Sequence, residues 1–216
     1  MLNNLIIFDF ETTGLDPYAD HVTEIAAVRL RGGREVGSFH TLVDFGGEVP
    51  VFITGLTGIT TELCSQGLPA LLAFRLLRNF IGDDVLVAHN AAFDVAYLTQ
   101  MYRRLGAFNT VQNDFLCTKT LAVASTPGVV SLGVNPHNGK PLGPYTLANL
   151  CLHFEIELVG AHRAMADVRA CAQLLDTLRA TYNEEATAQL INCCGMGPKH
   201  YPQRGLPAHA KPLIQS

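Results

Sequence analysis

Five residues of the sequence have side chains suited to metal binding and proton transfer: Asp9, Glu11, Asp94, Asp167 and His162. Carboxylates that gather around one point repel one another and raise one another's pKa values. Divalent cations such as Mg²⁺ or Mn²⁺ prefer oxygen ligands and remove this repulsion. A histidine has an unperturbed pKa near ~6.5 and can exchange a proton at neutral pH. The four acids therefore predict a cation site, provided that the fold brings them together.

The first two acids lie at the end of a predicted strand. Residues 5–10 form a short apolar run of the kind found in buried strands. Because side chains alternate between the faces of a strand, Asp9 and Glu11 share one face with Leu5 and Ile7. Both acids therefore point the same way at the carboxyl end of the strand, where ligand sites of open α/β sheets are commonly found.

The other two acids begin apolar stripes on predicted helices. On the helix expected over residues 91–105, with Asn90 as its N-cap, Asp94 shares a face with Leu98, Met101 and Leu105. On the helix expected over residues 163–182, Asp167 shares a face with Cys171, Leu174 and Leu178. A carboxylate on a core-facing stripe is costly unless it is paired or bound to metal.

Each acid taken alone also has an ordinary explanation. The helix dipole favours an Asp in the first turn by ~0.3–1 kcal/mol, and an acid can also sit at an exposed edge or pair with Arg or Lys. The four acids together favour the metal site. His162 precedes Asp167 by five residues, which on a continuous helix would place the two on different faces. We therefore expect His162 in the approach to the helix, after Gly160, where a cap or surface role is the alternative.

The elements that must position these residues follow from hydrophobic patterning. Strands are also expected over residues 22–30, 35–43, 85–88 and 113–117. The first two are joined by a hairpin turn at Arg31-Gly-Gly-Arg34. Further helices are expected over residues 69–81, 118–124 and 145–154, and loops over residues 49–61 and 127–144. The pattern predicts an α/β fold with a mixed sheet covered by helices. We expect a domain over residues 1–185 and a C-terminal tail over residues 186–216.

Composition narrows the class of protein. The chain has 216 residues, of which 48% are hydrophobic and 16% charged, as expected for a folded domain. No apolar run reaches the ~18 residues of a membrane span, and no signal peptide is predicted, so we expect a cytoplasmic protein with no membrane contact. The net charge of −4 counts against nucleic-acid binding unless acids are committed to cations. A zinc site formed by Cys193, Cys194, His200 and His209 fits no standard spacing.

Three segments resemble the motifs of the DnaQ-like (DEDDh) 3′→5′ exonucleases. They are Phe8-Asp-Phe-Glu-Thr-Thr-Gly-Leu15, His89-Asn-Ala-Ala-Phe-Asp94 and His162-Arg-Ala-Met-Ala-Asp167, in the family's order. Leu56-Thr-Gly-Ile-Thr60 and Tyr145-Thr-Leu-Ala-Asn-Leu150 are also similar to family segments. The resemblance covers residues 4–182. A tyrosine-type member would have Tyr at position 163, which is Arg here, so the resemblance is to the histidine type.

The resemblance implies a ribonuclease H-like fold with a mixed five-stranded sheet flanked by helices. It implies that Asp9, Glu11, Asp94 and Asp167 hold two divalent cations, Mg²⁺ or Mn²⁺, and that His162 is the general base. The implied activity releases nucleoside 5′-monophosphates from the 3′ end of single-stranded DNA in proofreading or repair, with a DNA polymerase subunit as a partner. The implied substrate contacts are Thr12, Thr13, Leu15, Leu56, Asn90 and Phe93, with the two leucines packed on the terminal base.

Two other functions fit parts of the same pattern. An RNA-trimming exoribonuclease, similar to oligoribonuclease or RNase T, would use the same motifs, and nothing in the sequence selects for the 2′-hydroxyl. An inactive nucleic-acid-binding or interaction module would be expected to lack at least one of the five residues, and all five are present.

Overall fold

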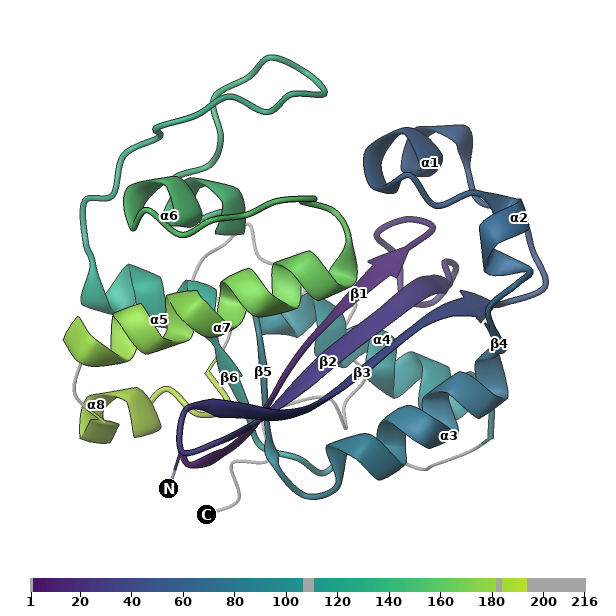
Figure 1. The fold of residues 1–216 in the computed structure, drawn as a ribbon, viewed down its shortest axis with the longest axis horizontal. Helices are drawn as coiled ribbons and strands as arrows, with labels where there is room; N and C mark the ends of the chain where they lie inside the picture. Colours follow the sequence, from purple (N-terminus) through teal and green to yellow (C-terminus); the bar gives the residue numbers. More distant parts are fainter. Residues whose placement is uncertain (1, 107–110, 182–183, 194–216) are drawn as a thin grey trace.

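The computed structural model describes residues 2–106, 111–181 and 184–193, and within them a mixed six-stranded sheet has helices on both faces (Figure 1). The strand order is β4-β3-β2-β1-β5-β6. The strands are β1 (Asn4–Thr12), β2 (Val22–Arg31), β3 (Arg34–Asp44), β4 (Leu68–Pro69), β5 (Val85–Ala88) and β6 (Phe115–Cys117). The helices are α1 (Val51–Thr57), α2 (Thr61–Cys64), α3 (Ala70–Ile81), α4 (Ala91–Arg104), α5 (Thr118–Ser125), α6 (Leu147–His153), α7 (Ala164–Thr181) and α8 (Glu184–Ala188).

The strand β1 lies inside the sheet, antiparallel to β2 and parallel to β5, which confirms the predicted mixed α/β sheet. The β2–β3 hairpin turns at Gly32 and Gly33, with φ values of 55° and 79°. A two-residue hairpin turn with positive φ at both positions matches the twist of the strands, and glycine adopts it without strain.

The alternation predicted along β1 divides the core into two layers. Ile6, Phe8 and Phe10 pack in one hydrophobic cluster with residues of α3 and α4. Leu5 and Ile7 pack in a second cluster with residues of α5, α6 and α7. Asp9 and Glu11 continue the second row, so both acids lie on the face of the sheet that α7 covers.

Two local predictions differ from the structure. The sheet has a sixth strand, β4, whose two residues pair with Val43 and Asp44 and are too short for a periodic signal. Residues 49–61 are not a loop, since they contain α1 and the start of α2. Pro50 lies at the N-cap of α1, and Gly58 ends it in the left-handed conformation. The proline and glycine thus mark the ends of a helix.

The described residues beyond 185 pack against the sheet. The Asn192 side chain accepts a hydrogen bond from the Phe115 N–H at 3.0 Å and donates to Asp114 at 2.8 Å. The predicted division at residue 185 stays a prediction. Most of the predicted tail lies outside the described residues, as do Cys194, His200 and His209 of the cysteine–histidine site. Within the described ranges, no helix is long and apolar enough to cross a membrane.

Candidate active site

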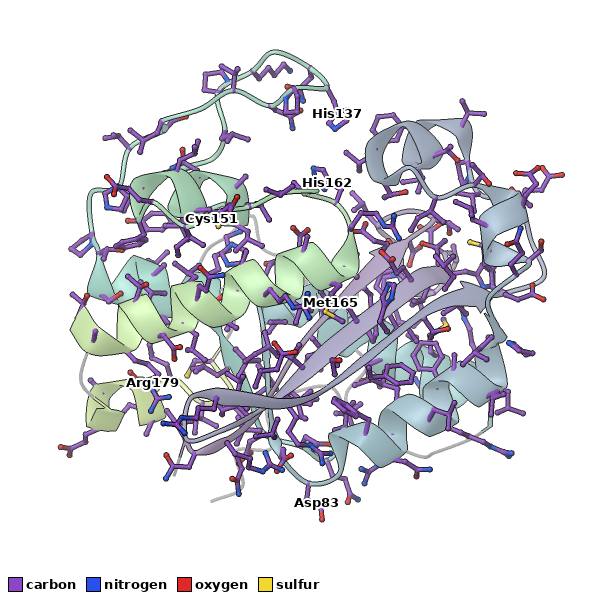
Figure 2. All side chains as sticks on the ribbon, viewed as in Figure 1. Asp83, His137, Cys151, His162, Met165 and Arg179 are labelled. Atoms are coloured by element: carbon purple, nitrogen blue, oxygen red, sulfur yellow. The ribbon has the colours of Figure 1, made fainter. Side chains whose placement is uncertain are left out.

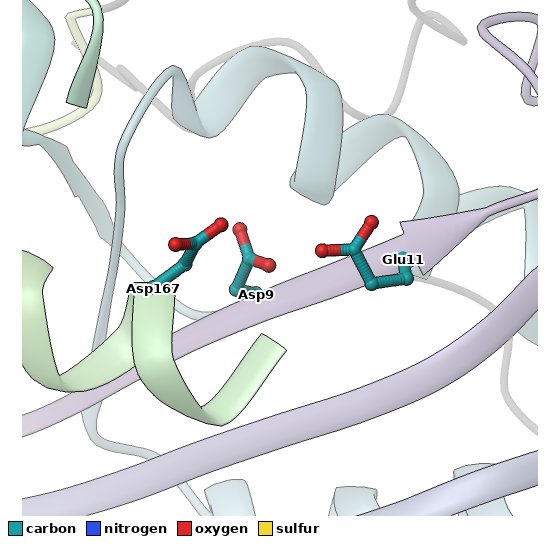
Figure 3. Close-up of side chains that lie close together, drawn as sticks. All are labelled: Asp9, Glu11 and Asp167. Atoms are coloured by element: carbon teal, nitrogen blue, oxygen red, sulfur yellow. The ribbon is translucent and has the colours of Figure 1, made fainter. Parts of the chain in front are cut away.

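Three of the four predicted acids meet at the carboxyl end of β1. One carboxylate oxygen from each of Asp9, Glu11 and Asp167 lies within 4.8 Å of the others. Figure 3 shows the two acids of β1 and the one at the start of α7 directed toward the same space. The residues behind Asp167 on its stripe, Cys171, Leu174 and Leu178, are buried against the sheet, as the periodicity predicts. Their packing fixes the rotation of α7 that turns Asp167 toward β1.

Asp94 approaches the same strand from α4. Its Oδ1 accepts a hydrogen bond from the backbone N–H of Phe10 at 3.3 Å, between the two acids of β1. Its charge is the largest single electrostatic contribution to the raised pKa of Asp9 after burial. Asp94 is buried and is not one of the three residues whose oxygens lie within 4.8 Å of each other. The structure therefore brings three acids into one cluster and places the fourth against the backbone of β1, between Asp9 and Glu11.

Without a bound cation, the ionised forms of these carboxylates are destabilised by burial and by their neighbours' negative charges. Burial, followed by the charges of Asp94 and Glu11, raises the pKa of Asp9 well above its usual range. Burial, followed by the charges of Asp167 and Glu24, raises the pKa of Glu11 to about 8. Burial raises the pKa of Asp167 to about 6, with the His162 N–H opposing the shift. At neutral pH the cluster would therefore hold protons, unless positive charge replaced them.

The donor set fits hard divalent cations. All the clustered ligand atoms are carboxylate oxygens, which Mg²⁺ and Mn²⁺ prefer. The Oδ1 atom of Asp167 is buried and has no hydrogen-bond partner among the described residues. A buried carboxylate oxygen without a donor is costly, and a cation would satisfy it. Asp9, Glu11 and Asp167 are the residues suited to hold such ions, with Asp94 beside them.

His162 lies where its spacing predicts, before the first residue of α7. Its φ of 65° is in the left-handed region, so the chain turns there and the helix begins two residues later. Its backbone N–H donates to Asp167 Oδ2 at 3.3 Å. Burial, and then the neighbouring His137, lowers the pKa of the imidazole below its ordinary value. A lowered pKa favours the neutral form of the imidazole, which can accept a proton.

A buried acid that the motifs do not include holds this turn in place. Glu24 lies directly opposite Glu11 in the β1–β2 pairing, and its side chain is fully buried. It accepts hydrogen bonds from Arg163 Nη2 at 2.7 Å and Nε at 3.2 Å, and from the Ala164 N–H at 2.9 Å. His40 Nε2 lies 2.8 Å from the same carboxylate. Glu24 therefore ties the sheet to the residue that follows His162.

Sequence reasoning missed Glu24, although a signal for it was present. Glu24 shares a face of β2 with Ala26 and Val28, which pack in the same cluster as the α7 side chains. That is the same pattern, an acid in an apolar row, that identified Asp9. His89, in contrast, belongs to a motif but is structural: burial lowers its pKa to about 4, and its ring lies 3.0 Å from both Thr118 Oγ1 and the Tyr145 carbonyl.

The predicted substrate contacts on the loop after β1 are held by Asp20. Its Oδ1 accepts from the Thr13 hydroxyl at 3.3 Å and its Oδ2 from the Asp16 N–H at 2.9 Å. A Cβ at Gly14 would come within 2.3 Å of this carboxylate, so a larger residue would displace the Asp20 side chain from its hydrogen bonds. The Thr13 N–H donates to the His21 carbonyl at 2.8 Å, and Thr12 and Thr13 are both buried. Sugar contacts at these two residues stay a prediction.

The remaining predicted contacts differ in exposure. Leu15 is 73% exposed on the loop, as a residue that packs on a base would be, whereas Leu56 on α1 is half-buried. The Phe93 ring packs 4.8 Å from that of Tyr97. Asn90 is the N-cap residue of α4, as predicted, but its side chain makes no capping hydrogen bond, and its φ of 69° places it in the left-handed conformation. Asparagine tolerates this conformation better than most residues, which accounts for its position in the turn.

The pKa shifts predict how the metal-free protein responds to pH. A carboxyl group whose pKa is raised on folding contributes stability below its unfolded value, near 4.5 for Glu11, and that stability is lost as pH rises to about 8. We expect the Tm in a chelator to fall by at least about 5 °C between pH 5 and pH 8, since 1 kcal/mol shifts Tm by about 2–4 °C. Thermal unfolding should show Mg²⁺ or Mn²⁺ reversing most of this loss. A Tm in the chelator that is the same or higher at pH 8 than at pH 5 would contradict this prediction. In the control variant Glu11→Gln, the Tm should depend less on pH.

Comparisons with known proteins place this site in a family. The RNase_T exonuclease family profile matches residues 6–175. The PolC-type DNA polymerase III of Bacillus subtilis (strain 168) is 34% identical over 170 residues, which are 79% of this chain and 11% of the polymerase. The PolC-type DNA polymerase III of Clostridium perfringens is 34% identical over 171 residues, with the same coverage. The chain thus spans about a tenth of the length of these relatives.

Solved structures show the same fold. Escherichia coli exonuclease I in complex with a dA16 oligonucleotide superposes with a TM-score of 0.69 at 17% identity, over 87% of this chain and 42% of that one. Exonuclease X in complex with 5′-overhanging duplex DNA superposes with a TM-score of 0.63 at 24% identity, over 86% of this chain and 98% of that one. With the profile match over most of its length, the chain belongs to the RNase_T exonuclease family of DnaQ-like nucleases.

Proposed function

We propose that this nuclease is a metal-dependent 3′→5′ exonuclease that releases nucleoside 5′-monophosphates from the ends of single-stranded DNA. The observation that carries the proposal is the carboxylate cluster of Asp9, Glu11 and Asp167, which lies within the segment matched by the exonuclease family. Asp94, at the backbone between the two acids of β1, completes the set. A group of oxygen ligands with raised pKa values suits phosphodiester hydrolysis assisted by divalent cations.

Each residue has a role in this proposal. The four acids hold two divalent cations, Mg²⁺ or Mn²⁺, which when bound lower the pKa of a water and neutralise charge that develops on the phosphate. His162 takes the proton from the attacking water, for which its neutral imidazole is suited. Glu24 and Arg163 position His162 and Asp167 by fixing the turn between them. Leu15, exposed on the loop that follows β1, packs on the terminal base.

The choice of DNA rests on the relatives. PolC-type enzymes are DNA polymerases, exonuclease I was solved in complex with a dA16 oligonucleotide, and exonuclease X was solved in complex with 5′-overhanging duplex DNA. We extend the substrate from these proteins to this chain. Association with a DNA polymerase is part of the same proposal, with proofreading or repair as the role, because the chain matches one segment of a much longer polymerase polypeptide.

A digestion panel tests substrate and direction together. Single-stranded DNA, blunt duplex DNA and RNA of one sequence, each labelled at the 5′ end, are incubated with Mg²⁺ or Mn²⁺. We expect a ladder that shortens from the 3′ end, release of 5′-monophosphates, and a rate on single-stranded DNA at least about tenfold above the other two. A similar preference for RNA would identify an RNA-trimming enzyme instead. If none of the substrates is hydrolysed, the proposal is wrong and the chain is an inactive binding module.

A further inference from the structure

The loop between α5 and α6, residues 126–146, has a defined hydrogen-bonded structure, and the proposed function assigns it no role. Asn149 of α6, which is fully buried, holds both of its ends. The Asn149 Oδ1 accepts from the Leu132 N–H at 2.7 Å, and its Nδ2 donates to the carbonyls of Val130 and Pro144 at 2.9 and 2.8 Å. One amide side chain thus uses its acceptor and both donors on the base of the loop. These hydrogen bonds therefore hold the two ends of the loop together at a fixed position beside α6.

The outer part of the loop is hydrogen-bonded as a short hairpin. Val134 and Pro141 form an isolated antiparallel bridge, and the Asn135 N–H donates to the Lys140 carbonyl at 2.8 Å. The Asn135 side chain accepts the His137 N–H at 2.9 Å, which is a turn that Asn favours. The loop therefore presents His137 in a defined position at its tip. In Figure 1 this segment rises beyond α6 on the side of the molecule where α7 begins.

His137 meets His162 there. The two rings are edge-to-face, with centroids 5.8 Å apart and planes at 62°, and Figure 2 shows both side chains between the loop and the turn before α7. The backbone of His162 is fixed by Asp167, and its neighbour Arg163 by Glu24. The imidazole itself makes no hydrogen bond to any residue in the described part of the chain. His137 is therefore the neighbour that restrains the ring rather than the backbone.

We propose that His137 is a positioning residue, which the loop clamped by Asn149 brings against His162 to hold its imidazole ready for proton transfer. This inference rests on the proposed function. Aromatic pairs of this geometry stabilise an arrangement by the equivalent of about a three- to tenfold change in an equilibrium constant. Loss of the contact should let the imidazole occupy other rotamers, so that only a fraction of molecules has the base in place.

The kinetic test compares three variants of the full chain on single-stranded DNA with Mg²⁺. His137→Ala is expected to lower kcat about three- to tenfold with KM within about twofold, and His137→Phe, which keeps a ring, should restore most of kcat. His153→Ala is the matched control, since His153 also lies edge-on to a ring, that of Phe154, but on the exposed end of α6. Unchanged or increased kcat in His137→Ala would overturn the proposal.

A double-mutant cycle separates positioning from direct contact with substrate. In a His162→Ala background, His137→Ala should have no further effect on kcat, because there is no imidazole left to hold. An equal loss in both backgrounds would mean that His137 acts on the substrate itself and would overturn the inference. The ring-proton resonances of His162 give a readout without activity: they should shift in His137→Ala and stay unchanged in His153→Ala. If the wild-type protein hydrolyses no DNA, the proposed function is wrong, and this outcome is distinct from a failure of the His137 inference.

Discussion

Asp9→Asn is expected to reduce the rate of hydrolysis by at least about 10³-fold, because bound cations supply several kcal/mol of charge stabilisation in reactions of this kind. The charges of four other acids raise the pKa of Asp9, namely those of Asp94, Glu11, Asp167 and Glu24. Asparagine keeps the shape of the side chain but removes its charge. Rates at saturating single-stranded DNA with Mg²⁺ measure the effect.

The stability of the same variant should move in the opposite direction. Removing one buried charge from a repelling group relieves the native state, so Asp9→Asn should have an equal or higher Tm than the wild type at pH 8 in a chelator. Asp83→Asn is the matched control, since Asp83 is fully exposed in the turn after α3, at the far end of the molecule from His162 (Figure 2). Wild-type activity in Asp9→Asn would refute the assignment of the cluster, and a folded but inactive protein would support it.

His162→Ala should lower kcat by about 10²–10⁴-fold, the contribution of a positioned general base. The loss should fall on kcat rather than KM, since the imidazole acts on the attacking water and not on the strand. The His162 backbone N–H, which bonds to Asp167, is kept in the variant, so cation affinity should change little. Cation titration followed by the Tm checks this point. A kcat within about twofold of wild type would remove His162 from the mechanism.

The strands and the acids could be predicted because the pattern that identifies them is local. The alternation along residues 5–11 alone places Asp9 and Glu11 on the same face as Leu5 and Ile7, and the sheet keeps this arrangement. The stripe beginning at Asp167 likewise gives the face of α7, because the helical period alone sets it. These predictions need no knowledge of which elements meet.

What the sequence could not provide depends on contacts between distant segments. The bonds from Arg163 to Glu24 join the turn before α7 to β2, far apart in the chain, and no spacing in the sequence connects the two residues. The position of His137 depends on how Asn149 closes a long loop, which its glycines and prolines mark only as irregular. Helix α1 was missed for a local reason, since Gly55 and the β-branched residues around it have low helix propensity, so its helical state depends on its ends and tertiary packing.

The order of the acids along the chain has a consequence for when activity can arise. Asp9 and Glu11 belong to β1, whereas Asp167 belongs to α7, the last long helix in the described part of the chain. Contacts between residues far apart in the chain form slowly, because a long loop must be closed first. A growing or truncated polypeptide that lacks α7 holds only part of the cluster. Nuclease activity would therefore be gained only after α7 has been made and has packed against β1.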